Sequence, residues 1–199
     1  MRLIWGCVLL GMLCSGIQAE EKILLQDNFS ESKLKERRAS RGDWVIENGM
    51  ASCTQDDELY KKYKNHGPII FYDVEFQNGT AQFAYQADGA RNVVFTANGA
   101  DGHVFRLIFT GNQMQVRAFP PDSEEKSALL GREELSIKAG SWVPVTVSLE
   151  GGQATITVGK EFKKSYEHAS FARSKTNISV GFSFGTVKFK DVQLTQSEN

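Results

Sequence analysis

The sequence predicts an all-β protein, a two-sheet antiparallel sandwich with little helix. Short runs that alternate apolar and polar residues recur along the chain, and Asn, Asp and Gly turns separate them at intervals of about 8–12 residues. No long amphipathic helix pattern is present. The clearest stretch is Ala90–Phe119, in which three strand-like runs follow one another between such turns.

The individual elements follow from these runs and turns. The strands expected in chain order are Ile23–Phe29, Asp43–Glu47, Met50–Thr54, Ile69–Phe76, Ala81–Ala87, Asn92–Thr96, His103–Thr110, Gln113–Phe119, Glu134–Lys138, Trp142–Leu149, Ala154–Val158, Ile178–Phe184 and Val187–Leu194. Turn pairs such as Asn98-Gly99, Gly111-Asn112 and Gly151-Gly152 favour hairpins between them. Ser30–Arg38 and Glu124–Leu130 could each form a helical turn, and Thr54–Gly67 and Pro120–Arg132 are the most loop-like stretches.

Alternation also assigns faces to the strands. His103–Thr110 and Gln113–Phe119 each have one apolar face and one mixed polar face, as expected of two sheets packed about 10 Å apart with wet outer faces. Simple alternation places His103 and Arg106 on opposite faces unless a β-bulge intervenes. Mixed polar and aromatic faces on neighbouring strands would together form a shallow groove, which we expect to be the binding surface.

The N-terminal residues are typical of an export signal. Arg2 supplies a positive charge, Leu3–Leu13 is apolar, and Ala19 is a small residue before Glu20. The apolar run is shorter than the roughly 20 residues that span a bilayer. We therefore expect a signal peptide at 1–19 and one β-sandwich domain at 20–199, exported to the periplasm, the cell surface or the medium, with no transmembrane segment after cleavage.

Composition narrows the functional classes. Of 23 Lys and Arg residues only Arg2 lies within 1–19, so the mature chain has two fewer basic residues than its 24 acidic ones. A nucleic-acid partner would call for a basic surplus, so none is expected. Cys53 is the single cysteine after residue 19, which excludes an intramolecular disulfide. The fold must rely on its core, and at this size about 70% of the unfolded surface is buried.

Several short segments carry a resemblance to a known family. They are Gln26–Phe29, Arg41–Gly49 with its Trp44-Val45-Ile46-Glu47-Asn48-Gly49 sequence, Gly102–Arg106, Gly140–Trp142 and Phe189–Val192. Together they resemble the concanavalin A-like jelly rolls of the laminin-G and glucanase type. More narrowly, they resemble bacterial domains of the 3-keto-disaccharide hydrolase or 3-keto-glucoside lyase/hydratase family, common in planctomycete-like bacteria. The resemblance implies a jelly-roll fold and a carbohydrate or glycoconjugate partner.

The same resemblance implies catalytic candidates. His103 would act as acid or base, and Arg106, or Arg91 instead, would orient the substrate. A retaining glucanase needs two carboxylates about 5–5.5 Å apart, and only Asp73 and Glu75 approach such a pair. A glycan-binding module with little or no catalytic activity is therefore the first hypothesis. A keto-glycoside lyase or hydrolase and a non-sugar envelope scaffold remain open as alternatives.

The remaining site candidates are polar or aromatic residues of the expected groove. The predicted ligand-binding residues are Tyr63, His66, Arg91, Gln115 and Arg117. No Cys/His spacing indicates zinc, and no metal is expected at the site. Asp27 and Asp191, on the first and last strands, could help to hold a structural Ca²⁺; no other cofactor is expected.

Overall fold

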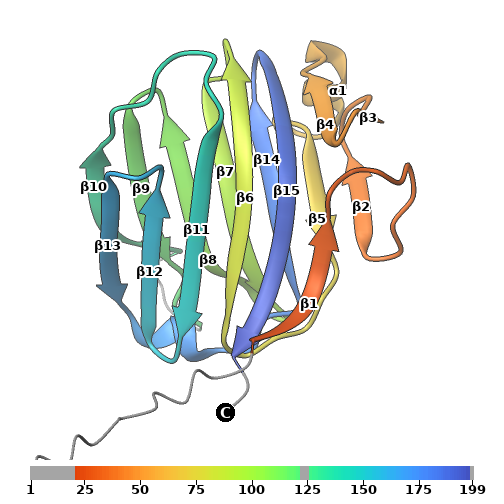
Figure 1. Ribbon diagram of the computed structural model, residues 1–199. Helices are drawn as coiled ribbons and strands as arrows, with labels where there is room; N and C mark the ends of the chain where they lie inside the picture. The colour runs from red at the N-terminus through yellow and green to blue at the C-terminus, as the bar shows by residue number, and fades with distance from the viewer. Residues whose placement is uncertain (1–20, 122–125, 198–199) are drawn as a thin grey trace, which may run out of the picture.

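The computed structural model describes residues 21–121 and 126–197, which form two antiparallel sheets packed face to face (Figure 1). The sheet nearer the viewer in Figure 1, here called the front sheet, contains β13 (Phe162–Glu167), β12 (Gln153–Val158), β11 (Val143–Glu150), β6 (Gly79–Asp88), β15 (Thr186–Ser197), β4 (Met50–Thr54) and β3 (Val45–Glu47) in that order, with β1 (Glu21–Asp27) also paired to β15. The rear sheet contains β10 (Ala128–Glu134), β9 (Gln113–Ala118), β8 (Gly102–Thr110), β7 (Asn92–Gly99), β14 (Asn177–Ser183), β5 (Ile69–Tyr72) and β2 (Arg37–Ser40).

The strand order is that of a concanavalin A-like jelly roll, as the sequence predicts. Hairpin partners such as β8 and β9 are neighbours in one sheet, whereas β6 lies between β11 and β15, which come from the C-terminal half of the chain. These long-range pairings place strands distant in sequence side by side in the middle of each sheet. The helical elements are short: α1 (Asp57–Lys62) and a 3-10 turn, η1 (Ala169–Ala172).

Aromatic side chains from facing strands fill the space between the sheets. Phe83 on β6 stacks on Phe95 of β7 with 5.5 Å between ring centroids, and Tyr85 contacts Phe109 of β8 at 5.2 Å. Each such ring removes about 150–250 Å² from water, which is the main favourable contribution to folding here. The rear sheet is thereby held rigidly from inside while its other face remains in solvent.

Three strands were not predicted, and all three lie at a sheet edge. They are β2, β10 and β13, which end the rear sheet on both sides and the front sheet on one side. Edge strands bury little of either face, so their sequences lack clear alternation. The prediction of a strand at Glu134–Lys138 was wrong, because β10 ends at Glu134. Within Ser30–Arg38 the chain forms one tight turn, in which the Arg37 N–H donates to the Leu34 carbonyl at 3.1 Å, and then begins β2.

The loop-like stretches also contain regular structure. The first, Thr54–Gly67, contains α1, whose start is capped by the Asp56 carboxylate accepting a hydrogen bond from the Leu59 N–H. The second contains most of β10. The helical turn expected at Glu124–Leu130 is not formed over Ala128–Leu130, which belongs to that strand; Glu124 and Glu125 lie outside the described residues.

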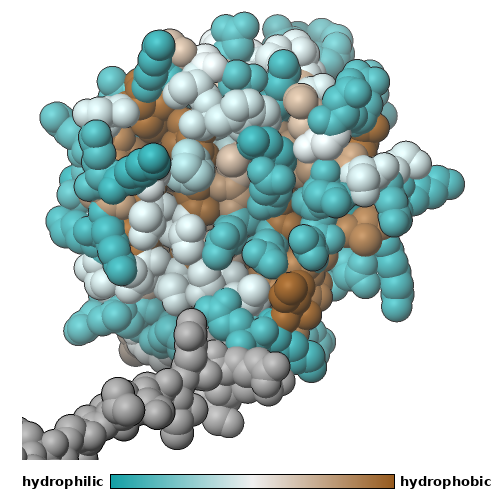
Figure 2. Space-filling view, viewed as in Figure 1, coloured by the Kyte–Doolittle hydropathy of each residue, from teal (hydrophilic) through white to brown (hydrophobic). Residues whose placement is uncertain are grey.

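The outer face of the front sheet is mainly hydrophilic, with only patches of hydrophobic surface (Figure 2). Within residues 21–121 and 126–197, no helix is both long enough and apolar enough to cross a membrane. The signal peptide predicted at 1–19 lies outside the described residues. Cys53 is buried and free, and burial followed by the charge of Asp43 raises the pKa of its thiol to about 11.

Candidate functional site

A groove of about 420 Å³ lies on the outer face of the rear sheet. Strands β5, β7, β8 and β14 form its floor, and the segment 65–68 forms one wall. The residues that line it are Arg41, Asn65, His66, Gly67, Pro68, Ile69, Phe71, Asn92, Val94, Thr96, Asn98, His103, Arg106, Ile108, Ser179, Gly181, Phe182 and Ser183. This set contains two arginines and two histidines but no Asp or Glu.

A β-bulge brings the two predicted catalytic residues together. In the β7–β8 pairing Ala97 lies opposite Phe105, yet the next residue, Asn98, lies opposite His103, so Val104 is the extra residue. Because a bulge shifts the side-chain alternation by one, His103 turns to the same outer face as Arg106. The Arg106 Nη2 then lies 2.6 Å from His103 Nε2.

A hydrogen-bond network fixes the tautomer of His103. The Asn98 amide nitrogen donates to Asn177 Oδ1 at 2.7 Å, which directs its carbonyl oxygen toward His103 Nδ1 at 2.6 Å. Since that oxygen can only accept, Nδ1 carries the proton, and the Nε2 lone pair accepts the bond from Arg106. Arg106 is held further by Nε donating to Thr96 Oγ1 at 3.3 Å.

The same surroundings keep His103 neutral. Burial, and then the positive charge of Arg106, lower the pKa of His103 from 6.5 to about 4. The Phe119 ring closes one side, with 5.1 Å between its centroid and that of the imidazole, and Arg106 Cζ lies 5.3 Å from the same ring. At neutral pH the pair is therefore a fixed hydrogen-bonding group, and His103 is a weak base.

His66 presents a second imidazole from the opposite wall. Its Nδ1 lies 2.9 Å from the Tyr63 carbonyl oxygen and 3.0 Å from that of Lys64. Both partners are acceptors, so Nδ1 donates and Nε2 remains as an acceptor on this exposed side chain. A sugar hydroxyl can donate to such a nitrogen.

Close packing at Gly67 holds this wall in place. A Cβ at Gly67 would lie 2.0 Å from the Phe182 backbone oxygen on β14, so only glycine allows the segment to approach the strand this closely. The Pro68 carbonyl accepts a hydrogen bond from the Phe182 N–H at 3.1 Å. Lys64 and Asn65, with φ of 55° and 63°, turn the chain sharply just before it.

The groove floor is apolar with small residues at its centre. Val94, Ile108 and the half-buried Phe71 supply apolar surface, and Ser179 and Gly181 of β14 leave room above it. One face of Phe71 is covered by Arg38, whose Cζ lies 4.4 Å from the ring centroid. An apolar floor with polar groups at both ends suits a ligand that has apolar ring faces and hydroxyl edges.

The other predicted ligand residues lie around the groove, outside its lining. Tyr63 is the exposed C-cap of α1, and Arg91 is exposed with its guanidinium 5.9 Å from the Phe184 ring. Gln115 and Arg117 lie on β9, paired with Ile108 and Arg106 respectively, so they extend the polar face by one strand. The structure thus unites His66, His103 and Arg106 in one groove and sets Arg117 directly beside it.

Each of the two aspartates considered for Ca²⁺ has a cationic side chain beside it. Asp27 is buried, and both its oxygens lie 2.9 Å from Arg37 Nη1, so its charge is already neutralised. Asp191 is exposed and lies 3.6 Å from Lys190 Nζ. Among residues 21–121 and 126–197 no cluster of three His, Cys, Asp or Glu side chains could hold a metal.

Sequence reasoning missed Thr96, Asn98 and Arg41. Asn98-Gly99 was interpreted only as a hairpin turn, whereas the Asn98 side chain orients His103. The β-bulge at Val104 brings the Asn98 and His103 side chains together. An Asn four residues before a Gly-His pair does not by itself predict such a bulge. Arg41 lines the groove with a left-handed backbone, φ of 61°, which the sequence does not reveal.

Comparison with known proteins shows the fold. The carbohydrate-binding module CBM66 from Bacillus subtilis is 10% identical and matches 81% of this chain and 96% of its own, with a TM-score of 0.60. The CBM2 module of the evolved Dit protein of Lactobacillus casei BL23 phage J-1 is 11% identical over 92% and 99%, with a TM-score of 0.63. SCLam, a non-specific endo-β-1,3(4)-glucanase of family GH16, is 8% identical over 89% and 92%, with a TM-score of 0.68.

Neither the protein-family models nor the curated proteins contain a match to this sequence. At identities of 8–11% the structural similarity establishes a concanavalin A-like β-sandwich and leaves the function to the site. The narrower resemblance to 3-keto-disaccharide hydrolases is not among these findings.

Proposed function

We propose that the protein binds a glycan in the groove on the outer face of the rear sheet, without hydrolysing it. The observation that carries this proposal is the lining itself. It combines an apolar floor with hydrogen-bonding groups, the His103–Arg106 pair and the His66 imidazole, that are held by the chain before a ligand arrives. Preorganised polar groups over an apolar floor bind with little ordering cost.

The absence of carboxylates from this lining argues against hydrolysis. Glycosidases of the usual kind need one carboxyl group as acid and a second as nucleophile or base. Among the residues lining the groove there is neither. Asp73 lies just after β5, is exposed, and forms an ion pair with Arg38, its Oδ1 3.2 Å from Nη2.

A keto-glycoside lyase activity is the second candidate, favoured by one observation, the contact between His103 and Arg106 in the groove. Elimination needs a base, and the low pKa of His103 with its lone pair bound by Arg106 makes it a poor one. His66 is the other imidazole that lines the groove, so it is the alternative candidate for the base. We expect no product from 3-keto-disaccharides, and product release that His66→Gln abolishes would establish the enzyme instead.

Blocking the groove tests the binding function. The protein is tested against a panel of oligosaccharides, both neutral ones such as β-1,3-glucan and β-1,4-glucan and acidic ones. Binding is measured by the rise in melting temperature and by calorimetry. A ligand at 100 times its Kd stabilises the native state by about 2.7 kcal/mol. We expect Ile108→Trp, which fills the floor, to abolish the shift and Thr146→Trp, on the outer face of the front sheet, to preserve it. Binding that survives Ile108→Trp places the site elsewhere; no binding by any sugar leaves the interaction scaffold.

Export of the chain after removal of residues 1–19 is part of the same proposal. A glycan-binding domain outside the cytoplasm meets cell-surface or extracellular polysaccharide. N-terminal sequencing of the protein recovered from the culture medium or envelope fraction should begin at Glu20. Retention of Met1 would contradict it.

A further inference from the structure

We infer that the glycan carries an anionic group, a carboxylate or a sulfate, recognised by Arg106 and Arg117. This inference rests on the proposed glycan binding and names the class of sugar. Arg106 and Arg117 are direct partners in the β8–β9 ladder, and both point outward from the rear sheet. Two like charges directly opposite each other in a ladder destabilise it, so the pairing needs a reason outside the fold.

The two guanidinium groups have no counter-ion in the part of the chain that the structure describes. The ion pairs there involve other cations, and Arg106 bonds only neutral partners, Thr96 and His103. Burial, and then the charge of Arg117, lower the pKa of Arg106. The positive charge of this pair is thus left uncompensated.

Arg117 adds an independent observation. Its Nη1 is buried and has no hydrogen-bond partner, although a buried donor without a partner costs about 1–3 kcal/mol. The rest of the side chain is only half-buried, and Arg117 lies directly beside the groove residue Arg106 on the same face of the rear sheet. An anion beside it would offset the charge that the protein leaves unpaired.

The surrounding charges favour the same ligand. Arg41 lines the groove, and the lining has no Asp or Glu to repel an anion, while the whole chain has a net charge of −1. The groove is therefore a local basic site on a slightly acidic protein. Arginine binds a planar carboxylate through two parallel N–H bonds, so a uronic acid suits the pair best; a sulfate ester offers the same charge.

Pairs of ligands that differ only in charge measure how much the anionic group contributes to binding. Calorimetry on the whole protein compares oligogalacturonate, alginate and hyaluronan oligosaccharides with their methyl esters, which keep the sugar and lose the charge. Carrageenan oligosaccharides and their desulfated forms make up the sulfate arm. We expect the acidic form of at least one pair to bind ten-fold or more tightly than its neutral form, with an affinity that falls between 50 and 300 mM salt.

Variants then assign the effect. Arg117→Met keeps the aliphatic stem and removes the charge, and we expect it to abolish the preference for the acidic form; Lys163→Met, on the front sheet, removes one charge elsewhere and should preserve it. Equal binding of acidic and neutral forms, or a preference that survives Arg117→Met, overturns this inference and leaves glycan binding intact. Failure of every sugar, neutral and acidic, overturns both proposals.

Discussion

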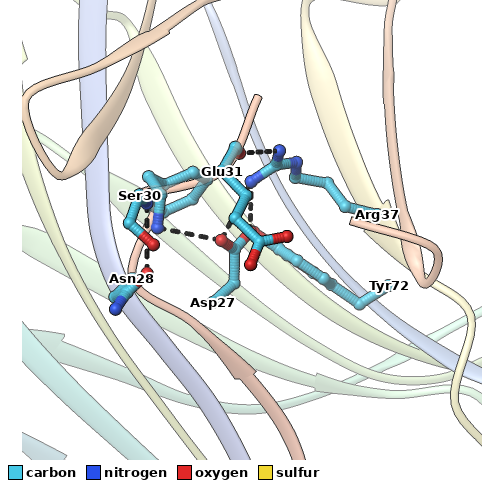
Figure 3. A network of polar contacts seen from close by, with 7 residues as sticks. Asp27, Asn28, Ser30, Glu31, Arg37 and Tyr72 are labelled. Atoms are coloured by element: carbon cyan, nitrogen blue, oxygen red, sulfur yellow. Dashed lines mark hydrogen bonds and ion pairs between the residues drawn. The ribbon is translucent and has the colours of Figure 1, made fainter. Parts of the chain in front are cut away.

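Arginine side chains occur in two different electrostatic environments in this protein, one beside a buried carboxylate and one without any ion pair within residues 21–121 and 126–197. Arg37 is buried beside Asp27, whose carboxylate also accepts hydrogen bonds from the Tyr72 hydroxyl and the Phe29 N–H, each at 2.9 Å (Figure 3). Arg37 Nη2 donates to the Glu31 backbone carbonyl at 2.6 Å. Arg106 and Arg117, in contrast, are paired across β8 and β9, and neither forms an ion pair with a carboxylate of the described residues.

The difference distinguishes an arginine whose charge the fold neutralises from two whose charge it leaves uncompensated. The Arg37 cluster joins β1 of the front sheet to β2 and β5 of the rear sheet, and both carboxylate oxygens of Asp27 accept hydrogen bonds from the protein itself. Such a buried and satisfied network fixes the arrangement of strands. The groove arginines gain nothing comparable from the fold, which is why we assign their charge to a ligand.

Removing the buried carboxylate should have the largest effect. Asp27→Ala leaves Arg37 buried without its counter-ion and Tyr72 without its acceptor, and we expect a loss of about 3–5 kcal/mol in the free energy of unfolding. Urea denaturation measures it. Asp73→Ala, which breaks the exposed Arg38–Asp73 pair, should cost less than about 1 kcal/mol. Similar losses for both variants would remove the distinction between buried and exposed pairs.

Much of the fold is predictable because central strands bury one face. Runs such as Gln113–Phe119 and Ala154–Val158 match β9 and β12 within one residue, since every second side chain enters the core. Edge strand β13 has a single buried residue, Tyr166, so no alternation marks it. Prediction fails at edge strands such as this one, whose few buried residues leave no alternation, and not at every edge, since β3 was predicted at Asp43–Glu47.

The placement of the candidate site residues can be predicted from the sequence only where a single hairpin decides it. A two-residue turn at Gly111-Asn112 fixes the ladder and sets Arg106 opposite Arg117, which the sequence alone allows one to count. The bulge at Val104, in contrast, depends on how β7 meets β8. The position of His66 depends on Gly67 packing against Phe182, a contact between residues more than 100 positions apart.

Lys175 is a buried cation held by backbone carbonyls, and its contribution to the free energy of unfolding should depend on pH. Its ammonium donates to the Gln77 and Phe171 carbonyls at 2.6 and 2.5 Å, and burial is the main cause that lowers its pKa from 10.5 to about 8. Because the unfolded chain keeps this proton up to about pH 10.5, the free energy of unfolding should rise between about pH 8 and pH 10.5, by up to about 1 kcal/mol per pH unit. Lys175→Met should flatten that rise in denaturation curves, and Lys163→Met should not. A rise that Lys175→Met leaves unchanged belongs to another group.

Arg117→Met should change stability in the direction opposite to Asp27→Ala. It removes a like-charge pair and an unpartnered buried nitrogen, and keeps the apolar stem, so we expect a gain of about 1 kcal/mol. Thermal and urea unfolding of the ligand-free protein would measure it. Arg37→Met, in which the buried Asp27 loses its partner, should instead destabilise. A loss of stability in Arg117→Met would mean that the fold itself uses this charge.

The smallest expected effect concerns His103, whose side chain remains partly in contact with solvent. Its pKa of about 4 lies below the ordinary 6.5, so between these values the unfolded state binds the proton and the native state does not. Stability should therefore fall as the pH drops from about 6.5 toward 4, as protonation removes the acceptor that Arg106 uses. His103→Asn should reduce this slope relative to the parent protein, and His66→Asn should leave it in place. If the slope is the same in all three proteins, the loss of stability belongs to another group, and the His103–Arg106 hydrogen bond adds nothing measurable to the free energy of unfolding.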